Sequence, residues 1–247
     1  MGNCLNFNEI INGPTTMSML TKEDFLNGQL LLIDKPLEWS SFQAVNALKW
    51  AIRRKFNLKK IKIGHAGTLD PLATGLLIIC TGKFTKRIPE LQGQIKEYTG
   101  TITLGSTTPS YDLETEINKT YPTEHITNEL ITIATKNFLG EIKQTPPIFS
   151  ALKKDGKRLY EFAREGKTVA IKPRQIQIFE FEITAINLPH VQFRICCSKG
   201  TYIRSLAHDF GETLNSGGHL SSLRRTKIGD YYVNNALTPD DFKEQKL

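Results

Sequence analysis

The residues best suited to chemistry lie in a glycine-rich segment, residues 64–77, which reads GHAGTLDPLATGLL. The segment holds one carboxylate, Asp70, directly before Pro71 and shortly before an apolar run. A carboxylate held there can act as a nucleophile or as a base, but aspartate before proline is also an ordinary turn residue. The segment alone leaves both interpretations of Asp70 open.

The same segment contains His65, whose role is equally open from the sequence. A single loop histidine is more often exposed or hydrogen-bonded than a general base, and no acid–serine pair accompanies it. The pattern therefore gives no support for a catalytic triad.

Cysteine and histidine usage argues against a metal site. The four cysteines and five histidines form no CxxC pair, no HExxH motif and no zinc-finger spacing. Cys196 and Cys197 are adjacent, so they would point to opposite faces of a strand, and Cys80 ends an apolar run. We expect free thiols, a reducing cytoplasmic location and no structural zinc.

The first half of the chain predicts the elements that must position the Asp70 segment. Short apolar runs at residues 29–34 and 76–80 predict buried strands, and residues 96–104 alternate as a strand does. Ser40 and Ser41 predict the start of an amphipathic helix that extends to about Phe56. Residues 105–122 lack any period and predict a long loop, a type of segment that is often functional.

The second half predicts further strands and helices of the same domain. Helices are expected at residues 127–138 and 202–214, and strands at residues 175–183, with a bulge at 178–179, and at 191–197. Thr238 and Pro239 predict a short final helix. We expect an α+β domain over residues 21–247, built on an antiparallel or mixed sheet, after a loose extension over residues 1–20.

The charge of the chain indicates a polyanionic partner. There are 32 Lys and Arg residues against 25 Asp and Glu, a formal net charge of +7. The surplus gathers in three clusters, around residues 49–62, 153–167 and 224–227. One cluster could serve only solubility, but three together favour nucleic acid. No apolar run approaches the roughly 20 residues of a membrane-spanning helix, so we expect no membrane partner.

A series of motifs, in a fixed order between about residues 29 and 229, carries a resemblance to a known family. The segments are Asp34-Lys35-Pro36 with Ser40-Ser41, GHAGTLDPLATGLL, Lys96-Glu97-Tyr98 through Leu104-Gly105, Thr108, Ser110 and Asp112, QTPPIFSA (144–151), GKRLYE (156–161), KGTYIRSL (199–206) and Leu223-Arg224-Arg225. Together they closely resemble the TruB-type tRNA pseudouridine synthases, which isomerise the uridine at position 55 in the T loop of tRNA.

The resemblance implies a reaction that needs neither a cofactor nor a metal, and it implies catalytic roles for three residues. Asp70 would be the nucleophile, which attacks or deprotonates the ribose, and Arg204 would keep its carboxylate ionised. Tyr98 would stack on the flipped uracil and relay the C5 proton. Taken singly, Arg204 could be a surface helix residue and Tyr98 a cross-strand core residue.

The resemblance also implies residues that bind the substrate. Tyr202 would line the pocket, Leu223 would close its apolar wall, and His65 would fill the space that the flipped base leaves in the RNA. Asp112 would support the site or contact RNA. Residues 144–167 would form an RNA-gripping insertion that orders on binding, with these basic residues facing phosphates: Lys153, Lys154, Lys157, Arg158 and, outside the insertion, Arg224.

The chain departs from the family pattern in a few places. Glu38 and Thr115 stand where relatives usually have glycine, and the chain ends soon after Arg225, where many relatives continue into a small PUA-like RNA-binding domain. We therefore expect no PUA-like domain and weaker contact with the acceptor stem. The expected partner is the T stem-loop of tRNA, bound by a monomer that needs no protein partner, since no heptad pattern or apolar stripe is evident.

Two other functions remain open at this stage. The chain could be a non-catalytic protein that binds and folds tRNA on the same scaffold, or a basic nucleic-acid module unrelated to the family. The first is disfavoured by the presence of Asp70, Tyr98 and Arg204, and the second leaves the glycine-rich segment unexplained. RNA folding and catalysis could also occur together.

Overall fold

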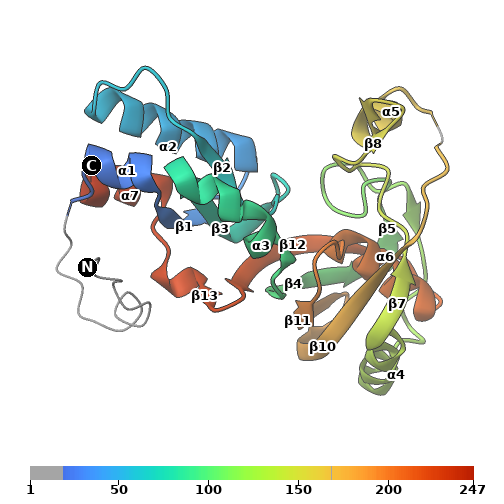
Figure 1. Ribbon diagram of the computed structural model, residues 1–247. Coiled ribbons are helices and arrows are strands. Elements are labelled where there is room, and N and C mark those ends of the chain that lie inside the picture. Colours follow the sequence, from blue (N-terminus) through green and yellow to red (C-terminus); the bar gives the residue numbers. More distant parts are fainter. Residues whose placement is uncertain (1–18, 168) are drawn as a thin grey trace.

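The first described element is a short helix that begins at Lys22. The computed structural model describes residues 19–167 and 169–247, so the expected extension over residues 1–20 lies almost wholly outside the described residues. Helix α1 (Lys22–Asn27) is capped by Thr21, which exchanges hydrogen bonds with Asp24 in a capping box. Figure 1 shows α1 beside the C-terminal end of the chain.

A single mixed sheet forms the centre of the molecule. Its strands run in the order β1 (Leu30–Lys35), β3 (Ala73–Thr81), β12 (Gly218–Ile228), β4 (Lys96–Leu104), β11 (His190–Cys197), β10 (Arg174–Asn187) and β7 (Gly140–Gln144). Strand β2 (Ile63–His65) pairs with β3, and β13 (Tyr231–Tyr232) pairs with β12. Only the β3–β12 pair is parallel among the strands described. The expectation of an α+β fold with a mixed sheet is confirmed.

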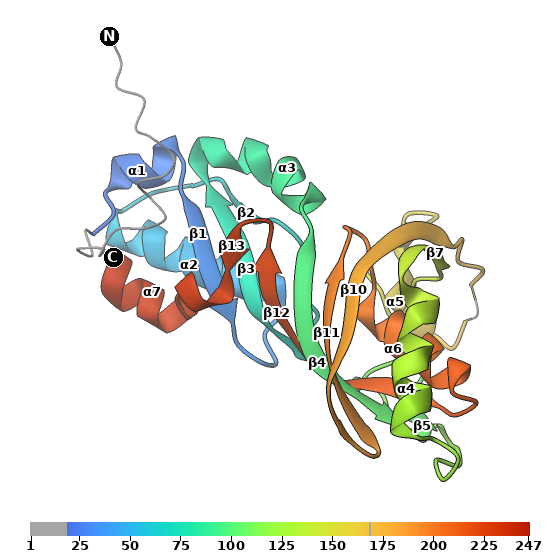
Figure 2. The same ribbon diagram turned by 90° about the horizontal axis from the view of Figure 1, so that it is seen from below.

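Helices cover the two halves of this sheet separately. Around β1 and β3 lie α1, α2 (Ser41–Lys55), α7 (Pro239–Lys246) and, after the 3-10 turn η2 (Gly82–Arg87), α3 (Ile88–Gly93). Around β4, β10 and β11 lie α4 (Asn128–Ala134), which continues as η3 (Thr135–Phe138), and α6 (Ile203–Thr213). Figures 1 and 2 show two lobes joined where β12 and β4 pass between them. The apolar core around β4, β10 and β11 also includes Leu69 and Ala73, while two further apolar clusters lie around β1 and β3. The lobes are therefore joined by strand pairing and by this packing.

Strand β12 was not expected from the sequence, although it lies in the middle of the sheet. Its sequence, GHLSSLRRTKI, has no clean alternation, and its register slips against β4 between Leu220 and Ser222 and again between Arg225 and Lys227. Such irregularities break the period of two on which strand prediction depends. The segment joins the two lobes and, as shown below, contributes to the site.

The other expected elements agree with the structure except at their ends. Strand β4 has the expected bounds, and β10 carries an irregularity between Ile178 and Glu180, where the bulge was predicted. Strand β3 is longer than the expected residues 76–80. The expected loop over residues 105–122 contains a two-stranded ladder of β5 (Ser106–Thr107) and β6 (Lys119–Thr120). Within the described part of the chain, no helix combines the length and the hydropathy needed to cross a bilayer.

The expected insertion forms a separate small unit beyond the sheet. It consists of a hairpin, β8 (Lys153–Lys154) and β9 (Lys157–Arg158), followed by α5 (Leu159–Arg164). Figure 1 shows it rising from the same side of the sheet as α2. Helix α2 is capped by Ser40, whose capping box with Gln43 is the start signal predicted from the sequence.

Candidate active site

A pocket of about 590 Å³ opens at the junction of the two lobes. Its walls come from the Asp70 segment, from Tyr98 on β4, from the start of α6 and from Leu223 on β12. The insertion contributes Ser150 to its rim. Elements far apart in the sequence therefore meet at one cavity, and the predicted residues Asp70, Tyr98, Tyr202, Arg204 and Leu223 all line it.

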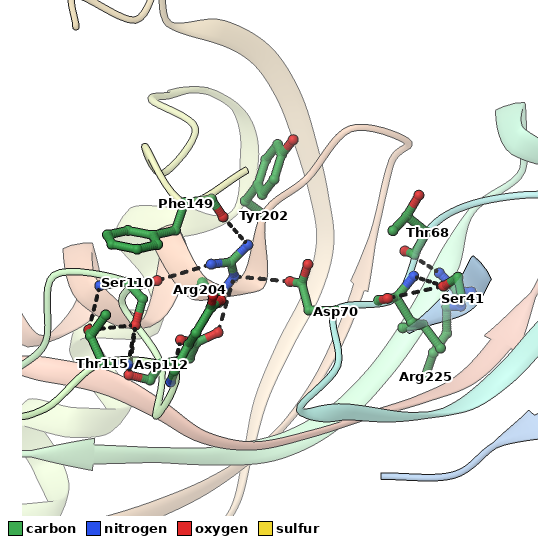
Figure 3. Close-up of polar contacts among 12 residues, drawn as sticks. Ser41, Thr68, Asp70, Ser110, Asp112, Thr115, Phe149, Tyr202, Arg204 and Arg225 are labelled. Carbon is green, nitrogen blue, oxygen red and sulfur yellow. Dashed lines mark hydrogen bonds and ion pairs between the residues drawn. The ribbon is translucent and has the colours of Figure 1, made fainter. Parts of the chain in front are cut away.

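Arg204 holds two carboxylates together at the floor of this pocket. Its side chain is only 3% exposed, and its Nε lies 3.0 Å from Oδ2 of Asp70 and 3.5 Å from Oδ2 of Asp112. The two terminal nitrogens donate to the backbone oxygens of Ser110, at 3.1 Å, and Phe149, at 2.8 Å. Figure 3 shows the guanidinium between the two acids. Each guanidinium nitrogen of Arg204 has an ion-pair or hydrogen-bond partner, so the group is held in one orientation. It therefore fixes where the Asp70 carboxylate can point.

The two acids have different surroundings. The Asp70 side chain is 42% exposed towards the pocket, whereas that of Asp112 is 7% exposed. Asp112 accepts a hydrogen bond from the backbone N–H of Glu114 at 3.0 Å, so both of its oxygens have partners inside the protein. Asp70 is therefore the acid that a substrate can reach, and Asp112 supports Arg204 from behind.

The protonation of Asp70 reflects a balance of opposing effects. Loss of solvent in the pocket raises the pKa of the Asp70 carboxyl above its ordinary value of 3.8, while the charge of Arg204 lowers it and that of Asp112 raises it. The sequence led us to expect that Arg204 alone would dominate this balance. Desolvation is the larger effect, and it makes the ionised carboxylate a more basic and more reactive group.

Backbone tethers hold the Asp70 segment in place. The hydroxyl of Ser41, at the start of α2, donates to the backbone oxygen of Leu69 at 3.0 Å and accepts from its N–H at 2.8 Å. The fully buried Lys35 ammonium donates to the backbone oxygens of Pro36, Trp39 and Pro71. Burial lowers the pKa of Lys35 to about 8. The Asp34-Lys35-Pro36 and Ser40-Ser41 motifs therefore shape the loop that carries Asp70.

Arg225 anchors the other side of the same loop, whereas the sequence placed it in a basic cluster for nucleic acid, for which its burial leaves it unavailable. It is 1% exposed, and it donates to the backbone oxygens of Leu76 at 2.8 Å, Gly67 at 3.0 Å and Thr68 at 3.4 Å. It also stands directly opposite Tyr98 in the β12–β4 register. The Leu223-Arg224-Arg225 motif contains this residue. Its burial could not be predicted, because the strand that carries it, β12, was not predicted either.

Two tyrosines form the aromatic wall of the pocket. Tyr98 is 8% exposed, and burial raises the pKa of its hydroxyl. Tyr202 precedes α6 as its N-cap, and the buried amide of Gln144 binds its backbone twice, accepting from its N–H at 2.8 Å and donating to its oxygen at 3.0 Å. The Arg174 guanidinium lies 5.4 Å from the Tyr202 ring centroid. Gln144, also missed by sequence reasoning, thus ties the insertion to the start of α6.

His65 is not among the residues that line the pocket. It lies on β2, opposite Ile79 of β3, two residues before the pocket residue Gly67. Burial lowers the pKa of its imidazole, so the ring is neutral at physiological pH. The His65 ring lies beside the pocket and is uncharged, which suits stacking on a nucleobase better than transferring a proton.

The predicted RNA-binding residues fall into two groups. Lys153, Lys154 and Arg158 are exposed on the β8–β9 hairpin, and Lys157 beside them forms an ion pair with Glu165. Arg224 lies elsewhere, on β12, where its two terminal nitrogens bind Asp34 at 3.1 and 2.6 Å. A bidentate pair of this kind links β12 to β1 and competes with any phosphate for the guanidinium.

One cluster of side chains in the described part of the chain has the geometry of metal ligands. His208, Asp209 and Glu212 of α6 place ligand atoms within 4.8 Å of one another. The His208 ring stacks on Tyr111 at 4.0 Å, and its Nε2 faces Glu212 at 3.6 Å. None of the three lines the pocket of Asp70.

Comparison with known proteins identifies the family. A family model described as TruB family pseudouridylate synthase (N terminal domain) matches residues 53–203, and one described as tRNA pseudouridylate synthase B C-terminal domain matches residues 204–247. A Flavobacterium johnsoniae protein called tRNA pseudouridine synthase B is 67% identical over 91% of this chain and 99% of its own length. A Phocaeicola vulgatus protein of the same name is 56% identical over 90% of this chain and 94% of its own length.

A solved structure shows the same fold at lower identity. A chain in the crystal structure of a Cbf5-Nop10-Gar1 complex matches with a TM-score of 0.67 and 29% identity, over 89% of this chain. The match spans 54% of that chain, so the present chain corresponds to about half of it. Site geometry, family models and relatives agree: the chain belongs to the TruB family of pseudouridylate synthases, enzymes that isomerise uridine in tRNA.

Proposed function

We propose that the chain converts uridine to pseudouridine at position 55, in the T loop of tRNA, with Asp70 as the nucleophile. The observation that carries this proposal is the half-exposed Asp70 carboxylate, held at 3.0 Å by a buried Arg204 in the wall of a pocket with two aromatic residues. The pocket volume of about 590 Å³ accommodates one flipped nucleotide.

The proposed reaction has no net oxidation or reduction. The bond between ribose C1′ and uracil N1 breaks, the ring turns, and a bond forms between C1′ and uracil C5. The proton on C5 leaves and N1 gains one, so atoms and charge balance. Asp70 either attacks the ribose or removes a proton from it, and both routes need the ionised carboxylate. No cofactor or metal takes part in either route.

The other pocket residues would position the base. Tyr98, in the wall beside Asp70, would stack on the uracil, and its hydroxyl would relay the C5 proton. Tyr202 and Leu223 would close the pocket around the ring. His65 would stack in the RNA where the base has left, which its neutral ring favours. Asp112 would act through Arg204.

The β8–β9 hairpin and α5 would bind the T stem-loop outside the pocket. The exposed Lys153, Lys154 and Arg158 suit phosphate contact, and Lys157 would join them by exchanging its ion pair with Glu165 for a phosphate. Arg224 would contact RNA only if its bond to Asp34 opens. The protein would act in the cytoplasm as a monomer without a protein partner.

The test is release of tritium from an unmodified tRNA transcript labelled at uridine C5. We expect the protein to release tritium and Asp70→Asn to release none while its dissociation constant for tRNA stays within about threefold, because the amide keeps the shape of the side chain. Mapping the product should place the pseudouridine in the T loop.

A second function, binding and folding of tRNA without catalysis, uses the same contacts. It is disfavoured because the Asp70–Arg204 pair has no evident use in a protein that only grips RNA. Tight tRNA binding without tritium release from several tRNAs would sink the enzymatic proposal and favour this one.

A further inference from the structure

A basic surface at the far end of α2 plays no part in the function proposed so far. It consists of seven residues, with no acid between the first and the last: Lys49, Arg53, Arg54, Lys55, Lys59, Lys60 and Lys62. We call this set the α2 basic face. All but Lys49 are exposed, and across residues 19–167 and 169–247 none of the seven has an acidic side chain within ion-pair distance.

Local helix stability does not explain this surface. Arg53, Arg54 and Lys55 lie in the last turn of α2, where cations interact favourably with the helix dipole. Lys59, Lys60 and Lys62 lie beyond the helix and make no such contribution. Like charges this close repel one another, so the cluster costs stability unless an anion binds it.

An exposed aromatic residue adjoins the same cations. Trp50 is 60% exposed, and the Arg54 guanidinium lies 5.1 Å from its ring centroid. This contact orders the Arg54 head group at the surface without pairing its charge. Arginine held in this manner is well suited to a phosphate.

The α2 basic face lies on the substrate side of the molecule but away from the pocket. The first residue of α2, Ser41, binds the loop of Asp70, and the helix then runs 15 residues to Lys55. At 1.5 Å per residue, the basic end lies about 20 Å along the helix from that loop. Figures 1 and 2 place α2 and α5 on the same side of the sheet, in separate lobes.

We propose that the α2 basic face binds the phosphate backbone of tRNA where its helix continues past the T stem, outside the T arm whose uridine enters the pocket. The inference rests on the function proposed above, because that function places the loop of a folded RNA at Asp70. A rigid RNA helix whose loop is held there must extend some tens of ångströms from it. The α2 basic face lies about 20 Å from the Asp70 loop on the same side of the molecule, so its positive charges can contact the phosphates of that helix.

The test compares two substrates and two variants. The substrates are a T-arm hairpin and the whole tRNA transcript, and the variants are Arg54→Gln/Lys55→Gln/Lys59→Gln and Lys59→Gln/Lys60→Gln/Lys62→Gln. The second variant lies outside α2 and cannot disturb that helix. The control is Lys136→Gln/Lys143→Gln, which removes two exposed cations in the other lobe, near α4 and on β7.

We expect each triple variant to bind the whole tRNA about tenfold or more weakly, with the slope of log affinity against log salt reduced by roughly three. For both triple variants, the affinity for the T-arm hairpin and the rate of tritium release at saturating tRNA should stay unchanged. The control variant should bind the T-arm hairpin and the whole tRNA as tightly as the unaltered protein does. Unaltered tRNA binding by both variants would overturn the inference, and so would an equal loss with both RNAs. Absence of tritium release from the unaltered protein would instead overturn the proposed function.

Discussion

At the scale of single residues, the site depends on one arginine shared between two acids of unequal burial. Arg204 offers one positive charge to two carboxyl groups. Loss of solvent raises the pKa of Asp70, the member that faces the pocket. The fold thus keeps a carboxylate that is less stable ionised than it would be in water.

This cost predicts opposite effects of the two acids on stability at pH 7. A group whose pKa is raised in the folded state loses favourable free energy as the pH rises through that pKa, so Asp70→Asn should leave the unfolding free energy equal or higher. Asp112→Ala should lower it by about 2–4 kcal/mol, because it leaves Arg204 and the Glu114 N–H short of a buried partner. Urea unfolding measures both, and equal losses would contradict the assignment.

The raised pKa of Asp70 also predicts the acidic limb of the pH–rate profile. Both routes need the ionised form, so the single-turnover rate should fall as the pH drops through the folded-state pKa, which lies above 3.8. Tritium release at saturating tRNA, with folding checked at each pH by circular dichroism, measures this. A rate that stays constant down to pH 4 while the protein remains folded would show that Asp70 is not titrated there.

At the scale of elements, the loop of Asp70 depends on how closely β3 and β12 approach. Gly75 has a φ of +100°, and a Cβ at this position would lie 2.3 Å from the backbone oxygen of Arg225. Glycine is the residue that tolerates both conditions. The parallel β3–β12 pairing therefore has a strict sequence requirement at one point.

Gly75→Ala should consequently lower the unfolding free energy by about 3 kcal/mol or more, since backbone cannot move aside as a flexible side chain can. Gly93→Ala is the matched control, because no atom lies within 4 Å of its added Cβ and its φ is not positive. It should be neutral or stabilising by about 0.5–1 kcal/mol. Thermal unfolding of both variants measures this difference in stability. A Gly75→Ala protein as stable as Gly93→Ala would contradict the close approach of Gly75 to the Arg225 backbone.

The sequence predicted those elements whose signals are local. Ser40 marked a helix start through its side-chain cap, and residues 96–104 showed the period of a strand. Strand β12 was missed because its two irregularities erase that period. An edge of the sheet can tolerate such a loss of pattern, but here it occurs in the centre.

The same distinction holds for the site. Asp70, Tyr98 and Arg204 were predicted because the family motifs carry them. Lys35, Gln144 and Arg225 act by binding backbone oxygens or N–H groups of segments distant in the sequence, and such contacts follow from burial. The sequence also could not show that Glu38 adopts a φ of +65°, a backbone conformation that favours glycine.

At the scale of the whole molecule, the basic residues of the insertion predict a salt-dependent grip on the T arm. Lys153→Gln/Lys154→Gln should weaken binding of a T-arm hairpin and reduce the slope of log affinity against log salt by about two, since each phosphate contact contributes about 0.9. Fluorescence anisotropy from 50 to about 300 mM salt measures this. An unchanged slope would show that Lys153 and Lys154 do not contact phosphate.

The central place of β12 has a consequence for synthesis of the chain on the ribosome. Strands β3 and β4, which position Asp70 and Tyr98, do not pair with each other, and β12 lies between them. A nascent chain that has emerged only as far as α6 therefore lacks the strand that joins β3 to β4 and the pocket residues Leu223 and Arg225 that it carries. We therefore expect the pocket to be complete only after residues 218–228 have left the exit tunnel.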